Sequence, residues 1–203
     1  RLIRDRALSL EEIIELFLAL LSGVSAIHKA GVIHRDIKPD NVIISNKNPI
    51  LVDFGIAKIS DKSRLTRITN TGQLVGTLAY IPPEILDGEL HDERSDIYQV
   101  GLCLYNALTG KHPFSGAVFA GLSSGAELAS FPLPSSHNKE VDSILDLIVL
   151  KAIALDPKER FETAEVFKSA LGTWLRMQSI PKLPSNEEGN RDNSYPSCSP
   201  RES

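Results

Sequence analysis

The sequence contains only two cysteines among its 203 residues. Cys103 falls in an apolar segment and Cys198 in a polar one, so we expect neither a disulfide framework nor a zinc site. This cysteine usage is typical of a reducing compartment and predicts a cytoplasmic location. The chain also lacks any run of roughly 18 apolar residues and any visible signal peptide, so no membrane segment is predicted within it.

The excess of one charge sign over the other is small as well. The formal net charge is -4 and the sequence pI is about 5.8, which gives no reason to expect a nucleic-acid partner. Hydrophobic residues make up 42% of the chain, enough to bury one sizeable core. The sequence begins with Arg1 and its only methionine is Met177, and we therefore expect it to be a piece of a longer protein.

Most of the apolar residues recur at helical spacing. Ser9 and Glu12 form a predicted capping box, and the apolar positions that follow predict a long helix that ends at Gly31. Segment 95–108 is apolar almost all round, which predicts a helix in the middle of the domain. Two amphipathic helices are predicted further along the chain, over residues 141–155 and 163–177.

One small hairpin is the only β structure that the sequence predicts. Two short β-like runs, 42–44 and 50–52, are joined by a polar turn at 46–49. Helices with a single hairpin make α+β the expected fold class. Residues 178–203 are rich in Pro, Ser, Asn, Glu and Arg and predict a disordered tail or linker, which leaves residues 1–177 as the domain.

Two irregular segments lie between the hairpin and the central helix. Residues 56–75 are polar and lack periodicity, and a connection of this length in a compact domain is usually functional or mobile. Residues 76–84 follow this connection, and Pro82 and Pro83 are expected to prevent a helix there.

The chemically informative residues lie on either side of the predicted hairpin. Residues 34–41 read His-Arg-Asp-Ile-Lys-Pro-Asp-Asn, and Asp53-Phe54-Gly55 follows the second strand. An acid, a base and an amide thus fall within one loop, and a second acid lies one hairpin later. His-Arg-Asp followed by Asp-Phe-Gly resembles the signature of protein kinases. The resemblance covers residues 1–177, and it identifies the carboxy-terminal lobe of a eukaryotic-type (Hanks-type) serine/threonine kinase.

This resemblance implies a role for each motif residue in the transfer of phosphate from ATP. Asp36 corresponds to the catalytic base that accepts the proton of the substrate hydroxyl, and Lys38 to the lysine that neutralises charge on the transferred phosphoryl group. Asn41 and Asp53 correspond to the two Mg²⁺ ligands, both of them oxygen donors. Ile43 corresponds to the apolar residue beneath the adenine ring.

The resemblance also implies the substrate class. Asp-x-Lys-Pro-x-Asn around Lys38 marks the serine/threonine branch of the family, so proteins with Ser or Thr are the expected substrates. Thr77 is expected to contact Asp36 and Lys38 in the segment that binds the peptide. Further residues are implied to have structural roles: Glu84 pairs with Arg160, and Asp96 supports the backbone of the catalytic loop. The sequence at Ser95–Tyr98 is more similar to that of bacterial members of the family than to that of animal members.

Regulation is a further expectation. Arg35 precedes the base directly, as in kinases that are switched by phosphorylation of the following polar segment, where a phosphate can pair with arginine. Thr69 and Thr71 lie near the positions at which bacterial relatives phosphorylate themselves. We predict that one or both are switch sites, with plain polar loop residues as the equal alternative.

Residues 1–33 contain no glycine-rich phosphate loop and no strand lysine, because the only lysine there, Lys29, lies at the end of the predicted helix. The amino-terminal lobe is therefore expected in the full-length protein, and the chain alone is expected neither to hold ATP well nor to turn over. Two alternatives remain. A pseudokinase or scaffold would follow if the strand lysine of the amino-terminal lobe is missing. The presence of Thr77 and Arg160 argues against a small-molecule kinase. The other histidines are interpreted as packing or solvated residues: His28, His91, His112 and His137.

Overall fold

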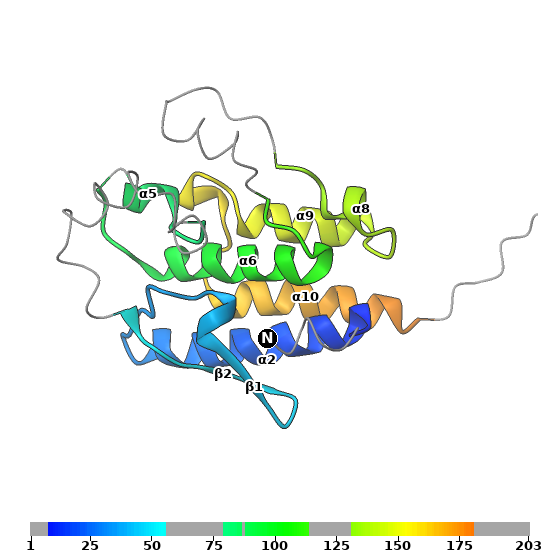
Figure 1. Ribbon diagram of the computed structural model, residues 1–203, viewed down its shortest axis with the longest axis horizontal. Helices are drawn as coiled ribbons and strands as arrows, with labels where there is room; N and C mark the ends of the chain where they lie inside the picture. The colour runs from blue at the N-terminus through cyan, green and yellow to red at the C-terminus, as the bar shows by residue number, and fades with distance from the viewer. Residues whose placement is uncertain (1–7, 56–78, 87, 114–130, 181–203) are drawn as a thin grey trace, which may run out of the picture.

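The computed structural model describes residues 8–55, 79–86, 88–113 and 131–180 (Figure 1). Within these ranges the chain is mostly helical, with one two-stranded antiparallel sheet, which agrees with the predicted α+β class. The elements in chain order are α2 (Leu10–Lys29), η1 (Pro39–Asn41), β1 (Val42–Ser45), β2 (Asn48–Leu51), α5 (Pro83–Leu86), α6 (Glu93–Thr109), α8 (Pro134–His137), α9 (Ser143–Ala152), η3 (Pro157–Glu159) and α10 (Ala164–Gln178).

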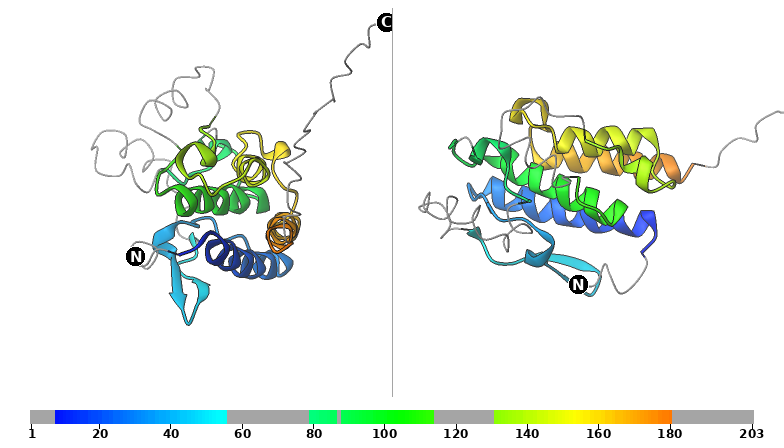
Figure 2. Two further views of the ribbon diagram at one scale, coloured as in Figure 1. Left: turned by 90° about the vertical axis from the view of Figure 1, so that its right-hand side faces the viewer. Right: turned by 45° about the horizontal axis from the view of Figure 1, so that its top comes forward.

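Four helices form the body of the domain. Helix α2 packs on α10 and α6, and α9 packs on α6 and α10 (Figure 2). Their apolar side chains form a common core. The hairpin and the loop before it lie beside α2 on one side of this bundle (Figure 1). None of the helices in the described ranges is long and apolar enough to cross a membrane.

Helix α2 begins and ends as its sequence predicts. The Ser9 side chain accepts a hydrogen bond from the Glu12 backbone, and the Glu12 carboxylate accepts one from the Ser9 backbone, which completes the capping box. At the other end Gly31 has a φ of 72° and its N–H donates to the His28 carbonyl, which closes the last turn. The end of α2 therefore fixes where the chain leaves the helix and enters loop 34–41.

Helix α6 is buried on almost every side. It begins at Glu93, two residues earlier than predicted, because Asp92 and Ser95 form a second capping box. Gly101 allows close contact with α9, since a Cβ there would lie 2.8 Å from Ala152 Cβ and 2.8 Å from Ile153 Cγ2. This helix is therefore the rigid element on which the surrounding segments are positioned.

The hairpin has a shorter turn than the sequence predicts. Ser45 pairs with Asn48, so the loop is only Asn46 and Lys47, and both have positive φ, as a tight hairpin turn requires. The prediction of a turn over 46–49 was wrong because Pro49 lies within β2, where it pairs with Ile44. A proline is tolerated there because β2 has no partner on its other side within the described residues.

Two other predictions need correction. The prolines at 82 and 83 do not prevent a helix, because Pro83 is itself the first residue of α5. The first helical position needs no N–H donor and suits the fixed φ of proline. Helix α9 begins only at Ser143, since Asp142 caps it, and it ends at Ala152. Helix α10 ends at Gln178, and the predicted tail lies outside the described ranges from residue 181 onward.

Candidate active site

Loop 34–41 connects α2 to the hairpin and brings three of the predicted site residues together. The Asn41 side-chain nitrogen donates hydrogen bonds to the Asp36 backbone carbonyl and to Asp36 Oδ2, both at 2.8 Å. Lys38 Nζ lies 3.1 Å from the same Oδ2 atom. Both Asn41 bonds use its amide nitrogen, so its Oδ1 atom is the one left for a cation. The carboxylate of Asp36 is thereby held in one orientation by Asn41 and Lys38.

Asp53 is placed next to this loop by the bonds of its neighbours. Val52 N donates to the Asn41 carbonyl at 3.0 Å, and Gly55 N donates to the His34 carbonyl at 2.9 Å. Asp53 itself has a positive φ of 57° and an exposed side chain. Aspartate tolerates this conformation better than most residues. The segment 52–55 is thus attached to loop 34–41 on both sides of the second acid.

Gly55 allows the close approach of these two segments. A Cβ at this position would lie 3.1 Å from Asp36 Cβ and 3.2 Å from the His34 carbonyl oxygen. His34 is fully buried, its Nε2 lies 3.2 Å from the Val52 carbonyl, and its ring packs against Phe54. These contacts make His34 a packing residue between loop 34–41 and segment 52–55.

Asp96, in the first turn of α6, supports loop 34–41 through its carboxylate. Its carboxylate is fully buried and accepts hydrogen bonds from the backbone N–H groups of His34 and Arg35, both at 2.8 Å. Arg35 has a φ of 71°, a conformation that costs roughly 1–2 kcal/mol for a residue with a Cβ. The bonds from Asp96 offset this cost, because charged acceptors make the stronger hydrogen bonds.

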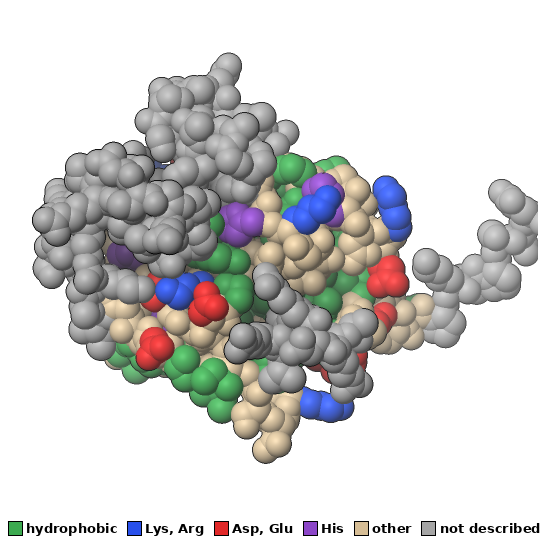
Figure 3. Space-filling model, in the orientation of Figure 1, with side chains coloured by type: hydrophobic (Ala, Val, Ile, Leu, Met, Phe, Trp, Pro, Cys, Tyr) green, Lys and Arg blue, Asp and Glu red, His purple; other side chains and the backbone are tan. Residues whose placement is uncertain are grey.

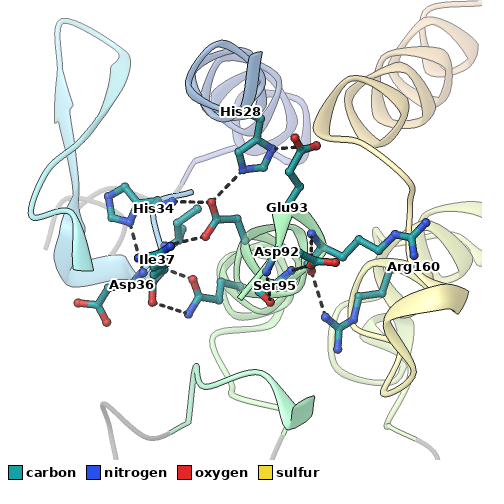
Figure 4. Close-up of polar contacts among 12 residues, drawn as sticks. His28, His34, Asp36, Ile37, Asp92, Glu93, Ser95 and Arg160 are labelled. Atoms are coloured by element: carbon teal, nitrogen blue, oxygen red, sulfur yellow. Dashed lines mark hydrogen bonds and ion pairs between the residues drawn. The ribbon is translucent and has the colours of Figure 1, made fainter. Parts of the chain in front are cut away.

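His28 is a member of this network that sequence reasoning missed. It is buried at the end of α2, with Nε2 2.9 Å from Asp96 Oδ2 and Nδ1 3.8 Å from Glu93 Oε2 (Figure 4). Its interpretation as a packing residue was incomplete, since it also orients the supporting carboxylate. A histidine in the last turn of a helix does not by itself signal a partner that is 68 residues away.

Glu84 and Arg160 form the pair that the sequence predicts. Arg160 donates from Nη2 to Glu84 Oε2 at 2.7 Å and from Nη1 to Glu84 Oε1 at 2.8 Å. Its remaining donors reach the carbonyls of Ala154, Arg94 and Leu155, and its guanidinium lies over the Tyr98 ring. Burial raises the pKa of Glu84, but the bonds and charge of Arg160 outweigh it, so this pKa lies below its ordinary value.

Ile43 lies on the outward face of the hairpin opposite Ile50, and 51% of its surface is exposed. Val42 and Leu51, on the other face, pack against the core. In Figure 3 apolar atoms are exposed near the hairpin, with acidic and basic side chains close by. The hairpin thus presents an apolar surface without a covering element in the described ranges.

A model of the protein kinase domain matches residues 1–171 of the sequence. The chain belongs to the protein kinase family. The Bifidobacterium longum probable serine/threonine-protein kinase PknB is 39% identical over 172 residues, which are 83% of this chain and 24% of that protein. The Streptomyces coelicolor probable serine/threonine-protein kinase SCO3848 is 37% identical over 176 residues, 86% of this chain and 26% of that protein.

Other relatives agree. The Mycobacterium tuberculosis serine/threonine-protein kinase PknB is 40% identical over 147 residues, which cover 71% of this chain and 23% of that protein. The crystal structure of a mutant of the M. tuberculosis PknI kinase domain has the same fold, with a TM-score of 0.60 at 24% identity over 83% of this chain and 56% of that one. The resemblance to bacterial Hanks-type kinases is confirmed, and this kinase chain spans about a quarter of the length of the curated relatives.

Loop 34–41 and segment 52–55 offer oxygen donors of the kind that Mg²⁺ prefers. Asn41 Oδ1 and the exposed Asp53 carboxylate are oxygen donors on adjoining segments, and Mg²⁺ is usually held by one or two such groups together with substrate phosphates. The described ranges contain no cluster of three or more His, Cys, Asp or Glu side chains that could hold a metal. Three predicted residues lie outside these ranges: Thr69, Thr71 and Thr77.

Proposed function

We propose that this chain is the catalytic carboxy-terminal lobe of a serine/threonine protein kinase, which transfers the γ-phosphoryl group of ATP to hydroxyl groups of protein substrates. The observation that carries the proposal is the cluster around Asp36. Its carboxylate is held by Asn41 and faces Lys38, while the segment with Asp53 is attached alongside. An oriented carboxylate next to a cation and two oxygen donors suits in-line phosphoryl transfer.

Each residue of the cluster has a distinct task in this proposal. Asp36 orients the attacking hydroxyl and accepts its proton at Oδ1 or Oδ2. Lys38 balances the charge of Asp36 before the reaction and that of the phosphoryl group during it. Asn41 and Asp53 would hold Mg²⁺, which supplies charge neutralisation when it is bound with ATP. The exposed Ile43 would lie beneath the adenine ring.

The substrate peptide is proposed to bind along residues 79–84, which we call the docking segment. Its far end is fixed by the buried pair of Glu84 and Arg160. Lys38 in the Asp-x-Lys-Pro-x-Asn order favours serine and threonine over tyrosine as acceptors. The same proposal assigns Thr77 to the contact with Asp36 and Lys38.

Phosphorylation is proposed to regulate the site through Arg35. The Nε atom of Arg35 is buried without a hydrogen-bond partner in the described part of the chain, so this side chain has a donor to offer to a phosphate. Thr69 and Thr71 remain the proposed acceptors. Phosphopeptide mapping of the active full-length protein should find at least one of them modified, and finding both unmodified would contradict the proposal.

The experiment that tests the catalytic proposal is labelling of a serine/threonine protein substrate by the full-length protein with ATP and Mg²⁺. Asp36→Asn should reduce labelling by about 10³-fold or more, because it removes the base and its charge. Asp40→Asn is the matched control, since Asp40 is an exposed acid in the same loop. Equal loss in both variants, or none in either, would contradict the role of Asp36.

The 203-residue chain by itself should show neither strong ATP binding nor turnover, because it contains no phosphate loop or strand lysine ahead of residue 34. These parts and a cytoplasmic location are proposed for the full-length protein. Isothermal titration of the chain with Mg-ATP checks the first point. Asp36-dependent phosphorylation by the chain alone would contradict it.

A further inference from the structure

Gln99 is a buried polar residue in the middle of α6, a helix that is otherwise apolar over most of its surface. Only 2% of its surface is exposed. Its Oε1 atom accepts a hydrogen bond from the Ile37 backbone N–H at 2.9 Å, and its Nε2 atom donates to the Tyr80 carbonyl at 3.1 Å and to the Arg35 carbonyl at 3.5 Å. A buried amide is costly unless it is paired, and here both of its ends are paired with backbone.

The backbone partners of Gln99 belong to two different segments. Ile37 and Arg35 lie in loop 34–41 on either side of Asp36, whereas Tyr80 lies in the docking segment. In Figure 4 the backbone at Asp36 and Ile37 faces the central helix. One side chain of two methylene groups thus spans the loop that carries the base and the segment that is proposed to hold the substrate.

The other contacts of the docking segment make this bridge informative. Glu84 is bound to Arg160 and Ser95, and the Tyr80 ring packs edge-on against His112. The first pair fixes the end of the segment against α6 and the residues after α9, and His112 supports the side chain of Tyr80. Neither contact reaches loop 34–41. Among the hydrogen bonds of the described residues, those of Gln99 join the docking segment to that loop.

We propose that Gln99 is a positioning residue that sets the separation between the Asp36 carboxylate and the bound substrate peptide. This inference rests on the proposed kinase function. Gln99 touches neither reactant, and it acts by holding the two backbone segments in register. Because a misplacement of about 1 Å can cost on the order of 100-fold in rate, such a bridge matters for catalysis as well as for stability.

The first arm of the test measures amide hydrogen exchange by NMR in the 203-residue chain. Gln99→Met keeps the size of the side chain and removes all three hydrogen bonds, so the Ile37 amide should exchange at least about 10-fold faster relative to the amides of α6. Leu104→Ala is the matched control, because it destabilises the same helix at a fully buried apolar position. In the control the Ile37 amide should change only in step with α6. Equal behaviour of the two variants would overturn the bridge.

The second arm measures peptide phosphorylation by the full-length protein. Gln99→Met should raise the KM for the peptide and lower kcat, with a combined loss of about 10- to 100-fold in kcat/KM, while the KM for ATP stays within about 2-fold. The nucleotide KM is spared because Asn41 and the Asp53 segment are held by bonds that Gln99 does not make, namely those from Asn41 to Asp36 and those from segment 52–55 to the loop. If the methionine variant does not fold, Gln99→Asn provides the same comparison, since it keeps the amide but is one methylene too short to reach both segments.

The outcomes distinguish failure of the proposed kinase function from failure of the positioning role of Gln99. Wild-type protein without Asp36-dependent phosphorylation would overturn the proposed function, and the positioning role with it. Active protein in which Gln99→Met accelerates exchange at Ile37 but leaves the peptide KM and kcat at the values of Leu104→Ala would overturn the positioning role alone.

Discussion

Replacing Arg160 with methionine is the sharpest test of how the docking segment is held. Arg160 is 3% exposed, and its substitution would leave Glu84 with the Ser95 hydroxyl as its remaining side-chain partner. The carbonyls of Ala154, Arg94 and Leu155 would lose a donor at the same time. Breaking one side of a buried ion pair typically costs about 3–5 kcal/mol, because an uncompensated charge stays behind.

This loss should be visible in thermal and urea unfolding of the 203-residue chain. For a chain of this size each kcal/mol shifts Tm by about 2–4 °C, so the variant should melt roughly 10 °C lower. Arg176→Met is the matched control, since Arg176 is an exposed arginine on α10, and it should change stability by less than about 0.5 kcal/mol. The double variant Arg160→Met/Glu84→Gln should recover at least about 1 kcal/mol, because the stranded charge is gone.

The pH dependence of the loss follows from the pKa of Glu84. In the native pair this pKa is lowered, so the pair stabilises the fold above the ordinary value of 4.5 and loses this contribution as pH falls through the native pKa. Without Arg160, burial alone would raise the pKa, and ionisation would then oppose folding. The stability difference between wild type and Arg160→Met should therefore grow from pH 5 to pH 8. A loss below about 1 kcal/mol, or one independent of pH, would refute the reasoning.

Three further predictions concern the surroundings of the site. Gly55→Ala should cost about 1–3 kcal/mol in urea unfolding and impair phosphorylation, because its Cβ would press on Asp36 and the His34 carbonyl, and unchanged values would count against this close contact. Asp96→Asn should destabilise the chain by about 2–4 kcal/mol, because one oxygen cannot replace a carboxylate that accepts three bonds, and a loss under about 0.5 kcal/mol would refute it. Burial lowers the pKa of His112 to about 4, so its contribution is complete above pH 6.5 and is lost as pH falls toward 4. His112→Gln should remove about 1 kcal/mol of that acid sensitivity, after allowance for its partial exposure, as measured by urea unfolding at pH 7 and pH 5.

The sequence alone determined the features that depend on residues close together in the chain. The capping box at Ser9 and the helix start at Thr163 could be predicted because a cap bonds to N–H groups two or three residues away. The site motif could be recognised for the same reason, since Asp36, Lys38 and Asn41 lie within one loop and need only its local conformation to meet. The partner of Glu84 was predictable from the family pattern.

Only the tertiary structure decided which distant groups meet. Gln99 reads in the sequence as one polar residue in an apolar helix, yet its bonds join segments 62 and 19 residues away. His28 likewise acquires its role only when α2 packs on α6 and brings it to Asp96. Such contacts depend on how buried faces pack, and that is set by the whole chain, so no local pattern carries them.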